Sequence, residues 1–368
     1  LGDVYKRQIT NFKNIADARL EFSPKINCLL GNNGMGKSNL LDAIYYLSFC
    51  KSFSGMADSA LTRRGVDFTT LRGLYTRRGT DEELTLGMQT GKRKSFKRKG
   101  KEYERLSAHI GAFPLVMIAP ADQELISGTG EERRRFMDMV ISQTDPVYLD
   151  HLIRYGRALQ QRNKMLRDHV VDHALYLAVE LALSRSAEYL TRARKRWVEE
   201  LTGIFNEIYS RIAADGETPS LALRSHLADA PDSLQSQLDS ARRHDEAVGH
   251  TSVGPHRDDI DLQLCQMPVR RAASQGQCKT YTIALRLAQY EFLRRAVGFK
   301  PLLLLDDIFD KLDATRVERL IRVVSDSGFG QIFITDTNRD HLDSIIASID
   351  YPHRSWMVAD GEFTPLQS

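Results

Sequence analysis

The residues with the most specific chemistry are Gly31-Asn32-Asn33-Gly34-Met35-Gly36-Lys37-Ser38. They fit G-x-x-x-x-G-K-[ST], a loop whose backbone N–H groups cradle phosphates. The glycines allow tight turns, and the positive end of a following helix dipole attracts anions. Lys37 is then expected to reach the outer phosphates, and the Ser38 hydroxyl to bind Mg²⁺. The stretch, with Asn39 directly after it, predicts a site for a nucleoside triphosphate.

The flanking residues supply the elements that this loop requires. Apolar residues from Ile26 to Leu30 precede it, and a helix-like run from Asn39 to Ile44 follows it. A strand that feeds a glycine loop and then a helix is the context in which the motif binds phosphate. This context argues against the alternative, a chance glycine-rich turn.

A second pattern near the end of the chain fits the other half of such a site. Four leucines, Leu302–Leu305, run directly into Asp306 and Asp307. A buried parallel strand delivers acidic residues to a site in this way, at its carboxyl end. We expect Asp306 to hold Mg²⁺, and Asp307 to act catalytically by positioning or polarising the attacking water, with Lys37. The alternative is a strand followed by an acidic turn.

The segment Ala273-Ser274-Gln275-Gly276-Gln277 stands directly before a predicted helix. It resembles the L-S-G-G-Q signature of ABC-type ATPases. Ser274, Gly276 and Gln277 at a helix N-terminus predict a second anion site. In that superfamily the signature meets the γ-phosphate held by another subunit. The resemblance therefore implies a homodimer that ATP closes and that hydrolysis loosens.

Composition narrows the class of protein. A chain of 368 residues accommodates about two domains. The net charge of +3 means that a nucleic-acid surface must be a local patch. Four scattered cysteines without C-x-x-C spacing favour a reducing cytoplasm and argue against disulfides or zinc. Apolar runs are too short to span a membrane, and no secretory signal is evident. Because the chain opens on Leu1 and Gly2–Gln8 is polar, we expect its first residues not to be the native start.

Hydrophobic patterning predicts the remaining elements. It predicts antiparallel strands at Phe68–Tyr75 and Leu84–Met88, a central strand within 111–120, helices from about 131 to 213 and a polar helix at 231–248. It also predicts strands at 251–253 and 260–264, a helix at 279–295 and an α/β segment to about residue 360.

Two clusters of cations have open interpretations. Gly91–Lys101, the densest basic run, is expected to be a hairpin tip. It is either a solvated edge whose lysines block aggregation or a finger that contacts phosphates. For Arg192 and Arg194–Arg196, on a predicted helix, a solvated helix face is favoured over a functional surface.

With these motifs in place, the chain resembles the RecF family, bacterial recombination-mediator ATPases related to SMC proteins, from about Ile9 to Gly361. Phe12-Lys13-Asn14 resembles the family's N-F-[KR]-N element, which implies that Lys13 approaches the nucleotide. The other matching elements are Pro120, Asp122, Gly128, Arg133, Arg134, Phe136 and Asp138; Gln161-Arg162-Asn163; Gly254–Asp259, a G-P-H-R-x-D loop; and Asp306-Asp307 with Leu312-Asp313 and Arg316.

There are departures from the family's pattern. Gln275 replaces a more usual glycine or arginine. Asp310-Lys311 replaces the usual small and acidic pair. Thr335-Asp336-Thr337 stands where many ABC enzymes have a switch histidine, which implies weak hydrolysis. The charged residues of Gly254–Asp259 could shape the nucleotide pocket or link it to DNA.

The resemblance implies an α/β fold, an ABC-type ATPase head (a P-loop NTPase with a mixed sheet) that carries an inserted α-helical arm and no long coiled coil. We expect the head to comprise 1–120 and 249–368, and the arm 121–248. It further implies a weak, DNA-stimulated ATPase that uses ATP and Mg²⁺ in the cytoplasm. Double-stranded or gapped DNA and the RecO and RecR mediators are the expected partners, in recombinational repair, replication restart and recombinase loading.

Two other ABC-type ATPases are the alternatives. A transporter ATPase subunit has Walker motifs closer together and a switch histidine, whereas here Ser38 and Leu302 lie 264 positions apart. An ATP-dependent nuclease subunit needs an added metal-binding domain, and no such domain follows residue 313. Dependence of DNA retention on nucleotide discriminates among the three.

Overall fold

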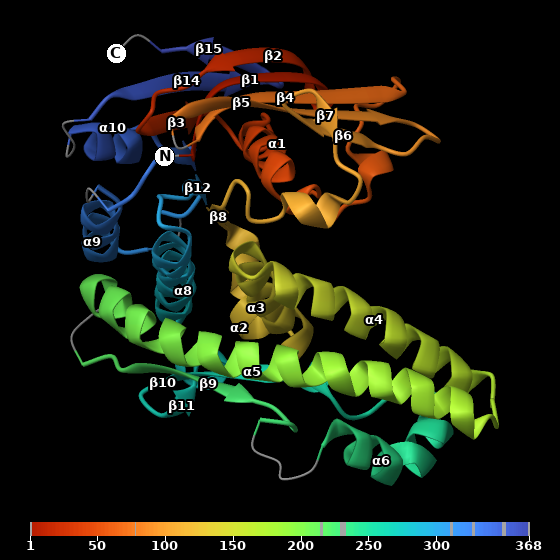
Figure 1. The fold of residues 1–368 in the computed structure, drawn as a ribbon. Helices are drawn as coiled ribbons and strands as arrows, with labels where there is room; N and C mark the ends of the chain where they lie inside the picture. Colours follow the sequence, from red (N-terminus) through yellow and green to blue (C-terminus); the bar gives the residue numbers. More distant parts are fainter. Residues whose placement is uncertain are drawn as a thin grey trace. The chain divides into compact units, whose positions relative to one another are not determined.

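The computed structural model describes residues 2–77, 79–213, 216–228, 233–309, 312–325, 328–347 and 351–366. The chain forms two compact units (Figure 1). Unit 1 comprises Leu1–Asp122, Arg211–Ala213 and Gln275–Ser368, and unit 2 comprises Gln123–Ser210 and Ala214–Ser274. Asp310 and Lys311, one of the departures noted above, lie outside the described residues.

The second unit extends further along the chain than the expected arm, 121–248. It also takes in 249–274, because strand β10 in that stretch pairs with β9 to form a sheet within unit 2. The boundary near residue 120 lies close to the expected one, and the boundary at 248 does not.

Unit 1 contains a six-stranded, mostly parallel sheet in the order β15-β14-β3-β13-β12-β8. Its strands are β3 Ile26–Leu30, β8 Leu115–Ile118, β12 Leu302–Asp306, β13 Ile332–Asp336, β14 His353–Ala359 and β15 Glu362–Pro365. All its pairings are parallel except β14 with β15. Strands β3, β13 and β12 are therefore neighbours whose carboxyl ends lie along one edge.

A second, antiparallel sheet in unit 1 has the order β2-β1-β4-β5-β6-β7. Its strands are β1 Gly2–Phe12, β2 Ile15–Glu21, β4 Phe68–Arg77, β5 Thr80–Gln89, β6 Ser95–Arg98 and β7 Lys101–Glu102. Along β5, buried residues alternate with more exposed ones, because one face of this strand packs on the core.

The helices of unit 1 are α1 Lys37–Phe49, α8 Gln275–Val297, α9 Ala314–Ser325 and α10 Arg339–Ala347, with short 3₁₀ turns η1 Asp58–Ala60 and η2 Leu106–His109. Helix α1 packs against strands of both sheets (Figure 1). It is buried along nearly its whole length, which explains its nearly continuous apolar sequence. The core of unit 1 therefore surrounds the helix that follows the phosphate loop.

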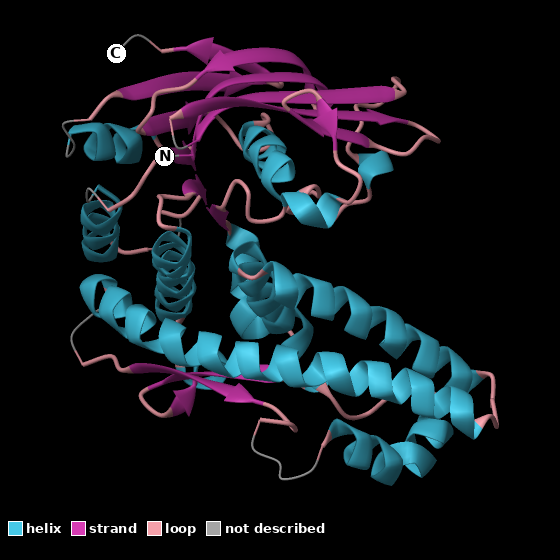
Figure 2. Cartoon of the chain, viewed as in Figure 1, coloured by secondary structure: helices cyan, strands magenta, loops and turns pink. Residues whose placement is uncertain are grey.

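Unit 2 is mainly helical (Figure 2). Its helices are α2 Glu124–Ser127, α3 Gly130–Thr144, α4 Pro146–Arg167, α5 His173–Ile212, whose last turn belongs to unit 1, α6 Leu234–Val248 and α7 Val269–Ala272. A three-stranded sheet, β11-β10-β9, consists of β9 Pro219–Arg224, β10 Asp259–Leu264 and β11 Met267–Pro268. Thr129 begins α3 with a capping box, and Asp145 caps α4 ahead of Pro146. Among the described residues no helix is long and apolar enough to cross a membrane.

Two expectations about elements are wrong. The segment Leu115–Ile118 is the edge strand of its sheet rather than a central one; it is fully buried because α1 and α8 pack against it. Residues 251–253 form no strand, since the backbone N–H groups of Thr251 and Ser252 donate to side chains of Asn163 and Asp245. The polar segment Gly2–Gln8 belongs to strand β1, in which Arg7 is buried and donates to the Tyr75 hydroxyl.

Candidate nucleotide-binding site

The phosphate loop lies between β3 and α1, as its motif requires. Gly36 has a φ of 115°, in the left-handed region that favours glycine. A Cβ at Gly31 would lie 2.3 Å from the Val358 carbonyl oxygen, and one at Gly36 would lie 3.0 Å from the Asn14 side chain. The Gly361 N–H, in the β14–β15 turn, donates to the Met35 carbonyl oxygen at 2.8 Å. Close packing on both sides therefore fixes the loop and explains two of its glycines.

Lys37 is buried inside its own loop. Its ammonium donates to the carbonyl oxygens of Gly31 at 2.6 Å and Asn32 at 3.0 Å. Among the described residues it forms no ion pair. A buried cation whose partners are neutral dipoles retains charge that an anion can balance. This arrangement suits a phosphate ligand.

Asp306 is brought to the loop by the order of the strands. The hydroxyl of Ser38 donates to its Oδ1 at 2.8 Å, and the hydroxyl of Thr335, on the intervening strand β13, donates to the same oxygen at 2.7 Å. Burial raises the pKa of Asp306, whereas these two hydrogen bonds and the positive charges of Lys37 and Lys13 lower it. Within the described part of the chain, Asp306 forms no ion pair.

The residues present fit a hydrated divalent cation. Carboxylate and hydroxyl oxygens are hard ligands of the kind that Mg²⁺ prefers, and Mg²⁺ commonly uses few protein ligands together with phosphate oxygens. Ser38 and Asp306 supply two such oxygens 2.8 Å apart. Elsewhere in the described chain, no cluster of three or more histidine, cysteine or acidic side chains is arranged to hold a metal.

Asp307 follows Asp306 in an unusual backbone conformation. Its φ is 46°, in the left-handed region, and its N–H donates to the Thr335 hydroxyl at 3.1 Å. Aspartate tolerates this region better than most residues, and such outliers gather at functional sites. Thr335 therefore orients two consecutive acidic residues through one hydroxyl. The catalytic role of Asp307 remains a prediction.

The turn between β1 and β2 also contacts the site. Lys13 has a φ of 52°, and its ammonium lies 2.6 Å from Oδ2 of Asp42 on α1. The Asn14 Oδ1 accepts a hydrogen bond from Asn39 at 2.7 Å. Lys13 is thus held beside the phosphate loop by an ion pair, and its approach to a nucleotide remains a prediction.

The signature segment spans the point in the sequence where the chain passes from unit 2 to unit 1. Ser274 is exposed and ends a stretch of unit 2, and α8 starts at Gln275 in unit 1. A Cβ at Gly276 would lie 2.8 Å from Nη1 of Arg316. Asp313 caps the start of α9 by accepting from the Arg316 N–H at 2.9 Å. The signature glycine therefore lies beside the segment with Asp313 and Arg316, which matches the family's pattern. Contact of Ser274, Gly276 and Gln277 with a nucleotide stays a prediction.

Two of the motifs that resemble the family meet inside unit 2. Arg133 of α3 makes a two-pronged contact with Asp259, at 2.6 and 2.9 Å, and Arg134 donates to the Asp258 carbonyl oxygen at 2.8 Å. The buried Arg194 of α5 binds Asp258 at 2.7 Å and Asp138 at 2.8 Å. These motif residues are therefore part of the interior of unit 2.

The glycine and histidine of the same loop are fixed as well. Gly254 has a φ of 122°, and a Cβ there would lie 2.6 Å from the Tyr155 hydroxyl. His256 contacts that hydroxyl through Nδ1 at 2.7 Å and the Thr251 carbonyl oxygen through Nε2 at 2.9 Å. Of the charged residues in the loop, Arg257 alone is exposed.

Arg162 of the Gln161-Arg162-Asn163 run is completely buried. It pairs with Glu180 at 2.9 Å and Asp245 at 2.7 Å, joining α4, α5 and α6. Arg162 and Arg194 are therefore interior residues, and the expectation that Arg194 belongs to a solvated helix face is wrong.

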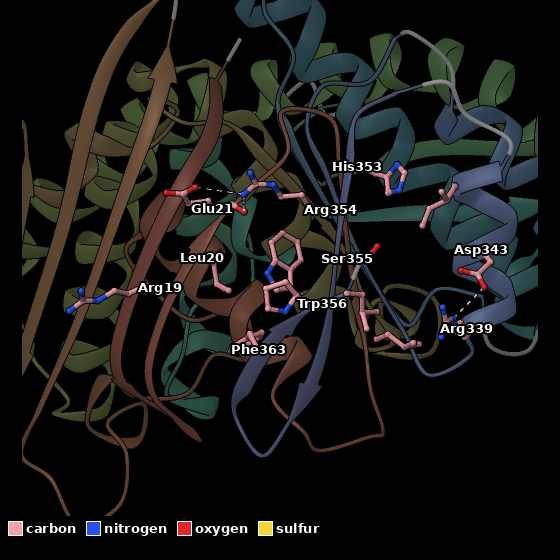
Figure 3. Close-up of a pocket in the computed structure, with 14 residues that line it drawn as sticks. Arg19, Leu20, Glu21, Arg339, Asp343, His353, Arg354, Ser355, Trp356 and Phe363 are labelled. Carbon is pink, nitrogen blue, oxygen red and sulfur yellow. Dashed lines mark hydrogen bonds and ion pairs between the residues drawn. The ribbon is translucent and has the colours of Figure 1, made fainter. Parts of the chain in front are cut away.

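A pocket of 760 Å³ lies in another part of unit 1, lined by residues of β2, α10, β14 and β15 (Figure 3). Four of its charged side chains form two pairs: Arg354 lies 3.8 Å from Glu21, and Arg339 lies 3.4 Å from Asp343. Trp356 and Phe363 also line it. Of the residues around the phosphate loop, only Leu30, which precedes it, contributes to this pocket. We assign it no ligand.

Sequence reasoning did not predict the contacts that three residues make at the nucleotide site. Thr335 orients the two aspartates, Asn14 packs on the loop, and Gly361 binds the loop backbone. Asp360-Gly361 carries the signal of a tight β-turn, with φ of 48° and 81°. No pattern in the sequence places that turn against residue 35.

Comparison with known proteins agrees with this geometry. The model of the RecF/RecN/SMC N-terminal domain family matches residues 4–350. The DNA replication and repair protein RecF of Parabacteroides distasonis is 47% identical over 362 residues, covering 98% of this chain and 99% of that protein. The RecF of Phocaeicola vulgatus is 49% identical, covering 97% and 96%.

Solved structures give the same result. The structure of the recombination mediator protein RecF-ATPrS in the RecFOR pathway matches with a TM-score of 0.89 and 26% identity, covering 100% of this chain and 98% of that one. An Smc head domain from Pyrococcus furiosus matches with a TM-score of 0.60 at 17% identity, which shows the fold alone. The expected ABC-type head with a helical insertion is confirmed, and the described residues contain no long coiled coil. The chain belongs to the RecF family of ATPases, within the RecF/RecN/SMC group.

Proposed function

We propose that this protein is an ATP-dependent DNA clamp of recombinational repair and replication restart. The observation that carries the proposal is that the hydroxyls of Ser38 and Thr335 both donate to Asp306, beside the buried Lys37. Lys37 and Ser38 begin α1, and Asp306 and Thr335 lie at the carboxyl ends of the neighbouring strands β12 and β13. Membership of the RecF family supports a role in DNA replication and repair. Solved relatives named RecF-ATPrS and RecF-ATP support ATP as the ligand.

In this proposal each chain holds ATP through Lys37 and the loop amides, and Ser38 and Asp306 hold Mg²⁺. When bound, Mg²⁺ would neutralise charge on the phosphate oxygens. Asp307 orients the attacking water, and Ser274, Gly276 and Gln277 clamp the γ-phosphate of a second copy. Two copies then close around duplex or gapped DNA, contact its phosphates without reading bases, and release it after slow, DNA-stimulated hydrolysis.

The proposed cellular role is loading of recombinase in the cytoplasm together with the RecO and RecR mediators. One solved relative is the recombination mediator protein RecF of the RecFOR pathway, which supports these partners. Because RecO and RecR are separate proteins, their binding is tested by pull-down with purified components rather than by DNA retention.

The test measures the mass of the protein by light scattering, and its retention on gapped duplex DNA, with ATP, with ADP and without nucleotide. We expect dimers and strong retention only with ATP. The Ser274→Arg variant should bind ATP and stay monomeric. The Asp307→Asn variant should form a dimer that persists longer than that of the parent, because ATP hydrolysis is slowed. DNA retention that is the same in all three nucleotide states would contradict the clamp.

A further inference from the structure

The most basic surface segment of unit 1 is the basic hairpin, residues 91–101, which contains β6 and the start of β7. Seven of its eleven residues are Lys or Arg, and none is acidic. It forms the outer edge of the antiparallel sheet (Figure 1). The contacts of its individual cations decide between a passive edge and a binding surface.

Two cations of the basic hairpin serve the fold. Lys94 lies 2.9 Å from Asp58 and donates to the Tyr46 hydroxyl at 2.7 Å and the Cys50 carbonyl oxygen at 2.8 Å. Arg98 binds both carboxylate oxygens of Glu82, at 2.5 and 3.0 Å. A third, Lys99, lies 3.8 Å from Glu82.

The other four cations, Lys92, Arg93, Lys97 and Lys101, are exposed. Their side chains form no ion pair or hydrogen bond within the described ranges of the chain. Strand alternation explains why Lys97 is exposed, since its neighbour Phe96 is buried and successive side chains point to opposite faces. Lysine side chains can protect a sheet edge from pairing, but four uncompensated cations on one hairpin also repel each other. Their arrangement suits a polyanion.

The basic hairpin packs on a buried platform, formed by Phe96, His109 and the end of α1 at Leu47. The ring centroid of Phe96 lies 4.7 Å from that of His109, whose Nε2 contacts the Leu47 carbonyl oxygen of α1 at 2.7 Å. Lys94 caps the same end of α1, where a cation opposes the negative end of the helix dipole. Helix α1 has 13 residues, hence a length of about 20 Å, and its other end carries Lys37 of the phosphate loop.

We propose that the basic hairpin is a contact surface for the backbone phosphates of duplex DNA, attached to the helix that binds the nucleotide. This inference rests on the proposed function and assigns part of its DNA contact to named residues. Lysine is depleted in protein–protein interfaces but common at nucleic-acid phosphates, and the only aromatic side chain of the hairpin, Phe96, is buried. These features favour DNA over an acidic protein.

The first experiment compares two variants that lose the same charge. The hairpin variant changes Lys92, Arg93, Lys97 and Lys101 to Gln. The control variant changes Arg157, Lys164, Arg167 and Arg243 of unit 2 to Gln; these are also exposed and without ion pairs in the described chain. Retention on labelled duplex DNA with ATP is measured from 50 to 300 mM salt.

We expect the Kd of the hairpin variant to rise about tenfold or more at moderate salt. The slope of its plot of log Kd against log salt concentration should be smaller by about 3 to 4, since each lost phosphate contact lowers that slope by about 0.9. The control variant should keep the slope of the parent protein, and both should bind a fluorescent ATP analogue equally.

A second measurement uses the unchanged protein and so does not depend on a variant folding. Lysines are acetylated briefly with and without duplex DNA in the presence of ATP, and modification is read by mass spectrometry. Lys92, Lys97 and Lys101 should be protected by DNA, whereas Lys164 should react equally in both samples.

Several outcomes overturn the proposal. They are equal DNA retention by the hairpin variant and the parent, equal loss in the control variant, or no protection of the three lysines. Loss of binding to poly-glutamate with unchanged DNA retention would assign the surface to an acidic protein instead. If the parent protein itself fails to retain DNA with ATP, the proposed function fails, which is a different result.

Discussion

Buried charge is balanced differently in the ion-pair network of unit 2 and at the nucleotide site of unit 1. In unit 2, Arg194 and Arg162 each contact two carboxylates, so cations and anions satisfy one another. In unit 1, Lys37 donates to carbonyl oxygens, and Asp306 accepts from hydroxyl groups. Neither Lys37 nor Asp306 has an ion-pair partner among the described residues.

This difference separates a structural cluster from a binding site. A closed network of ion pairs needs no ligand, and removing one member leaves a buried charge uncompensated. A buried cation and a buried carboxylate that lack partners are costly until a ligand brings opposite charges. The nucleotide and its metal ion carry these charges, so unit 1 is expected to gain stability on binding.

The largest expected effect is on unit 2. Arg194→Met should lower its free energy of unfolding by about 3–5 kcal/mol, because Asp138 and Asp258 stay buried without their cation. The chain has two tryptophans, Trp197 in unit 2 and Trp356 in unit 1. A Trp356→Phe background therefore lets Trp197 fluorescence follow urea unfolding of unit 2 alone.

The matched control is Arg196→Met on the same helix, where the arginine is exposed. It should change the stability by no more than about 0.5 kcal/mol. An Arg194→Met protein as stable as this control would mean that the network in unit 2 does not hold the fold together.

The second effect concerns ligand binding. Lys37→Ala should weaken ATP binding by at least about 100-fold, roughly 3 kcal/mol, because the phosphates lose their buried cation. Its unfolding, followed by Trp356 in a Trp197→Phe background, should change by no more than about 1 kcal/mol. Titration with a fluorescent ATP analogue measures the first quantity. A large loss of stability with normal ATP binding would make Lys37 a structural residue like Arg194.

The sequence predicts the elements around the phosphate loop well, because their signal is local. Gly31–Ser38 is one continuous motif, and the strand before it and helix after it occur as expected. The four-leucine run before Asp306 is typical of a strand buried on both faces, and this pattern predicts that Asp306 lies at the end of that strand, as it does. These inferences need only spacing and burial.

The sequence predicts poorly what depends on distant packing. Asn14 and Gly361 contact the phosphate loop only because β14 pairs with β3 and the turn after β1 folds over α1. Arg194 lies in a run of cations that looks solvated, and its partners at 138 and 258 are far away in the chain. A side chain's partners, rather than its type, decide whether it is structural or functional.

A pH prediction tests the platform under the basic hairpin. Burial lowers the pKa of His109 to about 4, although its hydrogen bond to the Leu47 carbonyl oxygen opposes this. The folded state therefore favours the neutral ring, so its contribution to stability is complete above pH 6.5 and is lost as the pH falls toward 4. The loss should reach roughly 3 kcal/mol. Urea unfolding of unit 1 at pH 7 and pH 4.5, compared with His109→Gln, isolates this contribution; equal pH dependence in both proteins would contradict it.

The smallest expected effect has the opposite sign to the first. Burial raises the pKa of Asp306, so without ligand the ionised carboxylate destabilises unit 1, and this cost grows as the pH rises above the ordinary value of 3.8. Asp306→Asn keeps the oxygen that accepts from Ser38 and Thr335 but removes the charge. The variant should therefore unfold at slightly higher urea than the parent at pH 7, and the difference should vanish below pH 3.8. With ATP and Mg²⁺ the order should reverse, because only the parent has the carboxylate that a cation can neutralise. A ligand-free Asp306→Asn protein that is less stable at pH 7 would place Asp306 with the structural carboxylates of unit 2.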